Sequence, residues 1–297
     1  MTKLNVFLLG KFRAERDNKQ LDGLEASKVK ELLSYLLVNC GRPQPRESLA
    51  ELLWTNQLPA TSRKYLRHTL WKLKSALEGD CKRKNSFLQI ETEWIQLNSS
   101  LDCWLDIVEF ETVFNLANRK RVRELSVNDI EAVQYALALY TGDLLEGWYQ
   151  DWCIFERERF QMMHLLLLDK SIQYCEIHHN YDAGLAYGAE ILRRDRAYER
   201  THRQIMRLHY MSGDRTQALH QYDRCAAALR ELLDVEPSER TKSLYEQIRT
   251  DTFRPPLFDL NKTSPRLTEN NPSANEILLQ LEKVYELLNR IEVQIKQ

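Results

Sequence analysis

The stretch TGDLLEGWYQDWCIFERERF, residues 141–160, decides how the rest of this 297-residue chain is interpreted. A Gly-Asp turn leads into a short apolar segment, two tryptophans follow, and a run rich in Arg and Glu comes next. Further on, Ala183-x3-Tyr187 recurs as Ala218-x3-Tyr222, an offset of about 35 residues that is close to the tetratricopeptide period. Residues 128–250 are therefore predicted to form helices joined by short turns, in which a small Ala lets neighbouring helices approach and the Tyr fills the space beside it.

The N-terminal third has a different pattern, with strands at both ends and helices between them. The expected elements, in order, are a strand over Leu4–Arg13, a strand near Lys19–Leu21, a helix capped by Ser27, a helix over Arg46–Trp54, a helix over 60–77, and a hairpin of 87–91 and 94–97. The Arg46–Trp54 helix is expected to bury Leu49, Leu52, Leu53 and Trp54. This order predicts a winged helix-turn-helix. The expected fold class is mainly α with a small β component: a winged helix-turn-helix, a tetratricopeptide-like helical repeat domain and a C-terminal amphipathic helix.

Charge is distributed unevenly along the chain, although the formal net charge is only −1. Residues 1–98 carry 17 Lys or Arg against 11 Asp or Glu, a net of +6, so the remainder carries −7. A basic head on an acidic body is typical of a protein that binds a polyanion through its N-terminal domain.

The helix expected over 60–77 presents long donors opposite its Leu66/Leu70/Leu73/Leu77 face. A helix that enters the major groove needs such donors for base edges and phosphates. The residues expected to contact DNA, including a basic cluster just after the helix, are Thr61, Ser62, Arg63, Lys64, Arg67, His68, Trp71, Lys72, Lys74, Lys82, Arg83 and Lys84. Arg67 is the best candidate for bidentate reading of guanine, whereas Lys64, Lys72 and Lys74 suit phosphate contacts. A solvated amphipathic helix is the alternative interpretation of this helix taken alone.

These motifs resemble a known family. Residues 66–77, LRHTLWKLKSAL, resemble the recognition helix of the Streptomyces antibiotic regulatory protein (SARP) family, with Trp71 where a small residue is usual. Asp106-x3-Phe110 and the stretch from residue 141 resemble the bacterial transcriptional activator domain. The resemblance implies a DNA-binding domain over 1–98 and a tetratricopeptide-like activator domain over 99–250. It further implies promoter DNA and RNA polymerase as partners.

A second basic cluster lies in the helical region and consists of Arg193, Arg194, Arg196, Arg200, Arg203 and Arg207. One interpretation is a site for an anionic partner, either a nucleotide-like effector or an acidic segment of RNA polymerase. The other, which we favour, is a surface balanced by Glu190 and Glu199.

Several classes of protein are not indicated. No apolar run approaches the length of a membrane span, and the first twelve residues lack the features of a signal peptide. The six cysteines form no Cys-x-x-Cys pair, and no nucleotide-binding, zinc-protease or nucleophile-elbow motif is present. We therefore expect a cytoplasmic protein that is not an enzyme and needs no metal or cofactor.

The C-terminal segment has its own pattern. A linker is expected over 251–272, followed over 273–297 by an a/d seam made of Ile277, Leu281, Val284, Leu288, Ile291 and Ile295. The seam predicts a helix that either forms a homodimer or docks on its own chain.

Together these patterns predict a sequence-specific transcription regulator that activates from promoter repeats. Two alternatives stay open: a helical adaptor that binds proteins, and a sensor of a small anionic effector.

Overall fold

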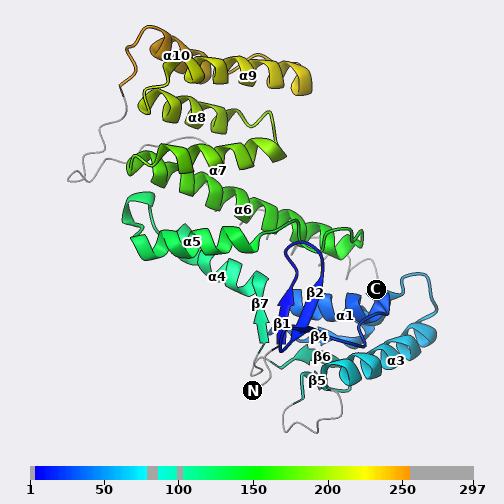
Figure 1. Cartoon of the computed structure of the whole chain (residues 1–297). Coiled ribbons are helices and arrows are strands. Elements are labelled where there is room, and N and C mark those ends of the chain that lie inside the picture. Colours follow the sequence, from blue (N-terminus) through cyan, green and yellow to red (C-terminus); the bar gives the residue numbers. More distant parts are fainter. Residues whose placement is uncertain (1–3, 79–85, 99–102, 255–297) are drawn as a thin grey trace. The chain divides into compact units, whose positions relative to one another are not determined.

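The computed structural model describes residues 4–78, 86–98 and 103–254, which fall into two compact units. The described part of the first unit comprises residues 4–78, 86–98, 103–112 and 139–153, and that of the second comprises 113–138 and 154–254. Figure 1 labels the elements along the chain. They are β1 Leu4–Phe7, β2 Arg13–Arg16, β3 Lys19–Gln20, α1 Ser27–Val38, β4 Gln44–Pro45, α2 Arg46–Leu53, α3 Pro59–Glu78, β5 Leu88–Ile90, β6 Trp94–Leu97, β7 Cys103–Leu105, α4 Asp106–Arg119, α5 Val127–Leu139, α6 Asp151–Ile177, α7 Tyr181–Arg194, α8 Glu199–Met211, α9 Arg215–Leu233 and α10 Glu239–Arg249.

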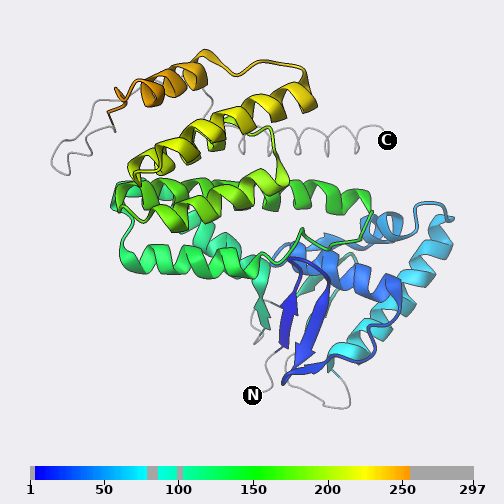
Figure 2. The ribbon, with the colours of Figure 1, turned by 45° about the horizontal axis from the view of Figure 1, so that its top comes forward.

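The first unit opens with a sheet of order β3-β2-β1-β7. Strand β1 pairs antiparallel with β2 and parallel with β7, and Figure 2 shows β1 and β2 side by side. The prediction of one strand over Leu4–Arg13 was wrong, because the chain turns at Gly10 and resumes as the separate strand β2. Gly10 has a φ of +108°, which residues with a side chain rarely adopt.

Three helices and a second sheet, of order β4-β6-β5, complete the predicted winged helix-turn-helix. The leucines expected on the inner face of α3 are buried, as are Leu49 and Leu53 of α2. Leu52 and Trp54, which were expected to be buried, are only half-buried. Ser27 does not cap α1 as predicted: it is the first helical residue, and the cap position is Ala26, which makes no side-chain cap.

Residues 139–153 belong to the same unit as the N-terminal strands, although the sequence places them more than a hundred residues away. Leu144 forms a β-bridge with Leu9, the Leu145 N–H donates to Leu8 O at 2.8 Å, and the Thr141 hydroxyl donates to Leu9 O at 2.7 Å. Gly142 suits this close approach, since a Cβ on it would lie 3.2 Å from the Gly10 Cα and would need a small shift of the backbone. The Gly-Asp turn of the stretch 141–160 therefore packs against the end of β1 and helps to complete the first unit.

The two tryptophans of that stretch pack against the N-terminal part of the first unit. The Trp148 ring lies 6.2 Å from that of Phe12, and the Trp152 ring meets Tyr35 edge-on at 5.2 Å. The unit therefore includes both the strands before Asn98 and a turn from the region expected to form the second domain.

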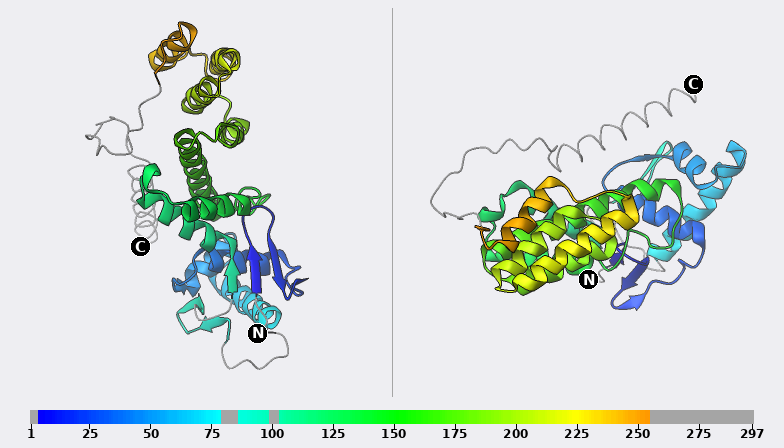
Figure 3. Two further views of the ribbon diagram at one scale, coloured as in Figure 1. Left: turned by 60° about the vertical axis from the view of Figure 1, so that its left-hand side comes forward. Right: turned by 90° about the horizontal axis from the view of Figure 1, so that it is seen from above.

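The second unit is helical. Helices α7, α8, α9 and α10 each pack on the next, which Figure 1 shows from the side and Figure 3 (left) nearly along the helix axes. One core cluster joins Leu168, Ile172, Ile191 and Leu208. Another joins Met206, Ala218, Leu244, Ile248 and Phe253. None of the described helices is both long and apolar enough to cross a membrane.

The turns before α7 and α9 are equivalent and lie 34 residues apart. His179 and Gly213 precede these helices with φ of 58° and 89°. The following residues repeat the same hydrogen bond, from the Asn180 N–H to Cys175 O and from the Asp214 N–H to His209 O. The repeat therefore has the tetratricopeptide period.

This period corrects the residue that was expected to allow close packing. Ala183 is half-buried, and the next residue, Gly184, is the buried equivalent of Ala218. A Cβ on Gly184 would lie 2.8 Å from Leu208 Cδ1, and one on Gly188 would lie 2.7 Å from Ile205 Cγ1. Helix α7 thus approaches α8 through two glycines, one turn apart.

The predicted fold, mainly α with a winged helix followed by tetratricopeptide-like helices, is confirmed. The C-terminal part of the prediction, most of the linker and the whole a/d seam from Ile277 to Ile295, lies outside the described residues.

Candidate nucleic-acid interface

Helix α3 is the longest helix of the winged helix-turn-helix. It begins at Pro59, a residue suited to a first helical position because its missing N–H would have no partner there. Leu66, Leu70, Leu73 and Leu77 recur every three or four residues and are buried against the rest of the unit. The opposite face is left to solvent.

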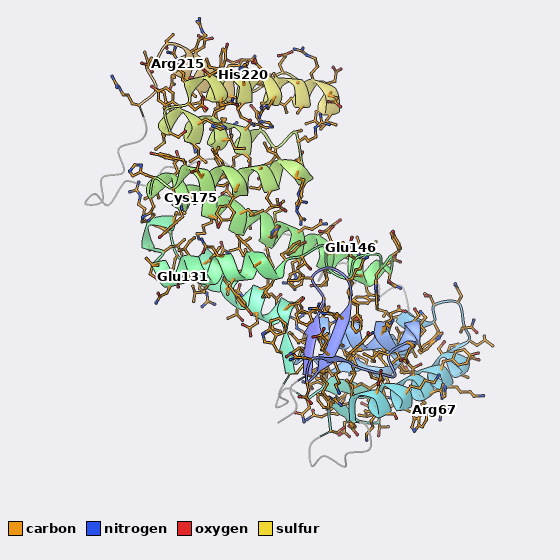
Figure 4. All side chains as sticks on the ribbon, viewed as in Figure 1. Arg67, Glu131, Glu146, Cys175, Arg215 and His220 are labelled. Carbon is orange, nitrogen blue, oxygen red and sulfur yellow. The ribbon has the colours of Figure 1, made fainter. Side chains whose placement is uncertain are left out.

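The exposed face has a centre and two flanks. We take as the centre the direction opposite the four buried leucines and count about 100° of rotation per residue. Lys64, His68 and Ser75 then lie along the centre, and Trp71 and Lys72 lie within about 50° of it. Arg63, Arg67 and Lys74 follow one flank, about 90° or more from the centre. All eight side chains are exposed, and Figure 4 shows Arg67 on the outer side of α3.

The two hydroxyl residues at the start of α3 differ. Thr61 is half-exposed, whereas Ser62 is 2% exposed. The Ser62 hydroxyl lies 3.3 Å from Leu58 O and 3.4 Å from Trp54 O, to which it donates. Because this hydroxyl is buried and is hydrogen-bonded to backbone carbonyl groups, Ser62 is not placed to hold a phosphate, and this part of the prediction was wrong.

Three cations of α3 have no acidic partner within the part of the chain that the structure describes. Among the described residues, no carboxylate pairs with Lys64, Arg67 or Lys72. Arg63 pairs with Glu47 at 3.2 Å, and Lys74 lies 3.9 Å from Glu78. Both are solvent-exposed contacts of the kind that contribute little stability. The face is therefore a surface of net positive charge that is available to an anion.

The segments beside α3 contribute less described positive charge to this surface. Lys82, Arg83 and Lys84 lie outside the described residues. The wing turn, Glu91-Thr92-Glu93, is exposed and carries two carboxylates. These carboxylates would repel a phosphate backbone, so α3 carries the charge complementarity of this domain.

The second basic cluster is arranged differently, because all six of its arginines have acidic partners. Arg193 and Arg194 approach Glu190, Arg196 pairs with Glu231, Arg200 with Asp169, Arg203 with Glu199 and Arg207 with Glu176. The prediction that Glu190 and Glu199 balance this cluster agrees with these pairs. Asp169, Glu176 and Glu231 join them from distant parts of the chain.

The most buried pair of this cluster is Arg207 with Glu176. The Arg207 Nε and Nη2 donate to the two carboxylate oxygens at 2.8 and 3.0 Å, and the Glu176 side chain is only 5% exposed. Arg203 and Arg207 also line a groove of about 490 Å³ with Arg240 and Glu239. Because both guanidinium groups already form ion pairs with carboxylates, this groove is less suited than α3 to bind an anion.

The bacterial transcriptional activator domain family matches residues 105–249. This match covers just under half of the chain, and it identifies residues 105–249 as a bacterial transcriptional activator domain. Mycobacterium tuberculosis EmbR in complex with a low affinity phosphopeptide has a similar structure, with a TM-score of 0.69 and 18% sequence identity over 86% of this chain and 67% of that chain. No curated protein matches the chain. The predicted resemblance to regulators with a bacterial transcriptional activator domain is confirmed by the match over residues 105–249 and by the similar fold.

The bacterial transcriptional activator domain begins beside a buried carboxylate, Asp106. Its Oδ2 accepts the N–H groups of Leu8 and Leu9 at 2.7 and 2.8 Å, and its Oδ1 accepts the Ile107 N–H at 2.8 Å. The side chain is 1% exposed. Burial raises the pKa of Asp106 to about 6 against the opposing effect of these backbone donors. Asp106 therefore ties the start of the matched domain to the end of β1.

Sequence reasoning identified Asp106 only as part of a family motif. Its partners precede it by almost a hundred residues and are backbone groups, which leave no trace in the sequence. Among the described residues, no group of three or more His, Cys, Asp or Glu side chains is placed to hold a metal ion.

Proposed function

We propose that this chain is a sequence-specific DNA-binding transcription activator of the cytoplasm, with α3 in the major groove of promoter DNA. The observation that carries the proposal is the charge of Lys64, Arg67 and Lys72, which no carboxylate of the described residues pairs, on the exposed face of the third helix of a winged helix-turn-helix. Cations without internal partners can neutralise phosphates and release counterions without first breaking an ion pair.

Within this interface, Arg67 reads a guanine and the lysines contact phosphates. A guanidinium can donate to guanine O6 and N7 together, which a lysine cannot do with the same geometry. Arg67 lies on the flank of the exposed face and its long side chain can reach a base from there, while the flexible side chains of Lys64 and Lys72 can extend back to the phosphates.

The first experiment is capture of genomic fragments by the purified full chain at two salt concentrations. A repeated short motif whose enrichment falls steeply with salt would support the proposal. Uniform capture, or none, would contradict it and would favour the adaptor or the sensor.

A second experiment separates base reading from phosphate contact. Arg67→Ala is expected to weaken binding to the enriched motif by about 1–3 kcal/mol and to relax preference at one base pair. Lys64→Ala is the matched control, because removing a cation that touches only phosphate weakens all sequences alike. Unchanged affinity of Arg67→Ala for the motif would exclude Arg67 as a base reader.

Activation would follow from contact between the helical domain and RNA polymerase, while neighbouring protomers occupy adjacent repeats. The family match supports this role, since it covers the helices from Leu105 to Arg249. Two linked protomers gain affinity through effective concentration. Transcription in vitro from a promoter with two motifs, compared with one, tests both points: equal output from the two templates would contradict cooperation.

The seam from Ile277 to Ile295 would hold the two protomers together. Deletion of 273–297 is expected to lower the mass measured by light scattering from that of a dimer to that of a monomer. An unchanged mass would show that this segment does not join protomers.

A further inference from the structure

Trp71 is the largest apolar side chain on the exposed face of α3. Its side chain is 66% exposed, although it is surrounded by Lys64, Arg67 and Lys72 along the same helix. The His68 ring lies 6.1 Å from it with an interplanar angle of 15°, so the two rings are stacked and form one small aromatic surface. A single exposed apolar residue is ordinary, but two stacked rings among cations make a small surface of distinct chemistry.

The position of these two rings on α3 indicates which part of the DNA they would contact. His68 lies within about 10° of the centre of the exposed face and Trp71 within about 50°, whereas Arg67 lies about 90° away. A recognition helix inserts the centre of its exposed face deepest into the groove. The two short, rigid rings would therefore meet base edges, whereas the longer side chains of Lys64, Arg67 and Lys72 can extend beyond their own positions on the helix.

On one side of Trp71, the neighbouring surface carries no net charge. Trp71 borders an open groove of about 820 Å³ whose charged lining residues are Arg16, Lys19, Lys72, Asp17, Asp22 and Glu25. Three cations and three carboxylates leave this groove without net charge. The contact made by the Trp71 indole is then one of shape and apolar surface, not of charge.

We propose that Trp71, backed by His68, recognises the C5-methyl group of thymine, so that this chain prefers a thymine within its operator. The inference rests on the proposed function, since it assumes that α3 occupies the major groove. The thymine methyl is the only apolar group that a base pair presents there. Burying it against an indole removes both from water.

The helix also fixes where that thymine lies. Trp71 follows Arg67 by one helical turn, which is about 6 Å along the axis at 1.5 Å per residue. Successive base pairs are about 3.4 Å apart. The thymine is therefore expected about two base pairs from the guanine read by Arg67.

The test uses duplexes selected from a random library by the full chain. In the best-bound duplex, each thymine is replaced in turn by deoxyuridine, which lacks only the methyl group, and binding is measured by fluorescence anisotropy. The wild-type chain is expected to lose about fourfold in affinity at one or two positions, the effect of removing one buried methyl. Trp71→Ala is expected to bind thymine and uracil duplexes equally.

Tyr65→Ala provides the matched control. Tyr65 is also an exposed aromatic residue of α3, at 43%, but its ring faces Trp54 at 5.9 Å, away from Trp71. This variant should keep the wild-type ratio of thymine to uracil affinity. Trp71→Leu retains an apolar contact and should keep part of that ratio.

The outcomes separate this inference from the function on which it rests. Sequence-specific binding with no thymine effect at any position, or with the same effect in wild type and Trp71→Ala, overturns the role of Trp71 and leaves DNA binding intact. Failure of the library to yield any preferred duplex overturns the proposed function, and this inference with it.

Discussion

Two helical regions of this protein carry similar numbers of basic side chains but differ in what those side chains contact. On α3, Lys64, Arg67 and Lys72 pair with no carboxylate of the described chain. On α7 and α8 and the turn between them, the six arginines from Arg193 to Arg207 all have carboxylates within ion-pair distance. A count of basic residues does not distinguish the two regions.

The difference indicates two separate uses of positive charge. Arginines that already pair with carboxylates link neighbouring helices or brace a single helix, and an external anion must displace an internal one to bind them. Cations without such partners are balanced only by mobile counterions, which a polyanion releases. The first arrangement contributes to stability, and the second contributes to binding.

The largest effect is expected where the paired arrangement is most buried. Arg207→Ala leaves the Glu176 carboxylate, 5% exposed, without its two donors. Such a change typically costs about 3–5 kcal/mol of unfolding free energy. Urea unfolding at pH 7, followed by circular dichroism, measures it.

The matched control neutralises both partners. Glu176→Gln combined with Arg207→Gln should recover more than half of the lost stability, because no charge is left buried alone. If Arg207→Ala lowers the unfolding free energy by less than about 1 kcal/mol, the pair is worth no more than a surface contact, and the proposed difference between the paired arginines and the unpaired cations of α3 is wrong.

The unpaired arrangement should show its effect in DNA binding rather than in stability. Replacing Lys64, Arg67 and Lys72 together by alanine is expected to weaken duplex binding at least about a hundredfold near 0.1 M salt. The slope of log K against log salt should fall by about 0.9 for each phosphate that is no longer neutralised. The unfolding free energy should change by less than about 0.5 kcal/mol, since all three side chains are exposed.

The same change at Arg193, Arg196 and Arg200 provides the contrast. These arginines are at least 55% exposed and each has a carboxylate partner. Their replacement should leave both the DNA affinity and the salt slope unchanged. An equal loss of affinity in both triple variants would show that total charge, not pairing, governs binding.

The sequence predicted the features that depend on local periodicity. The leucine spacing placed the inner face of α3 correctly, and with it the outer face that carries the cations. The recurrence of Ala and Tyr revealed the helical repeat, although the register was wrong by one residue because Gly184, not Ala183, takes the tight position.

Features that depend on distant partners could not be predicted. Glu176 and Asp169 lie 31 residues from the arginines they bind, so their roles required the packing of α6 against α8. Ser62 was expected to hold a phosphate because its hydroxyl stands at a helix start, but the fold buries that hydroxyl against two carbonyl groups. Residues 139–153 join the N-terminal part of the chain through backbone hydrogen bonds, the Thr141 hydroxyl and two tryptophan rings, and the sequence does not show which distant groups they meet.

Asp106 differs from both groups of cations, because it is a buried carboxylate for which the described residues provide no counterion. Among the described residues, the contacts found for its carboxylate are backbone N–H groups, and its pKa is raised from 3.8 to about 6. The folded state therefore binds the proton more tightly than the unfolded state. This contribution to stability is complete below about pH 3.8 and is lost as the pH rises through about 6, with a slope of at most about 1.4 kcal/mol per pH unit.

The measurement is the difference in unfolding free energy between wild type and Asp106→Asn from pH 4 to pH 7. Wild type should lose stability relative to the variant as the pH rises, since asparagine does not titrate. A difference that stays constant with pH would mean that Asp106 titrates alike in both states, and that its backbone donors fully offset burial.

The smallest effect is expected at Arg193, which belongs to the same cluster as Arg207 but is 73% exposed. Its partner Glu190 lies one helical turn earlier, with a closest N–O distance of 2.7 Å, and is also approached by Arg194 at 3.8 Å. Exposed pairs of this kind contribute about 0–1 kcal/mol, so Arg193→Ala should cost less than about 0.5 kcal/mol in urea unfolding. DNA affinity should stay within about twofold of wild type, because surface substitutions away from an interface rarely act at a distance. A stability loss approaching that of Arg207→Ala would show that burial does not separate the arginines of this cluster. A tenfold loss of DNA affinity would instead make the arginine cluster part of the nucleic-acid interface.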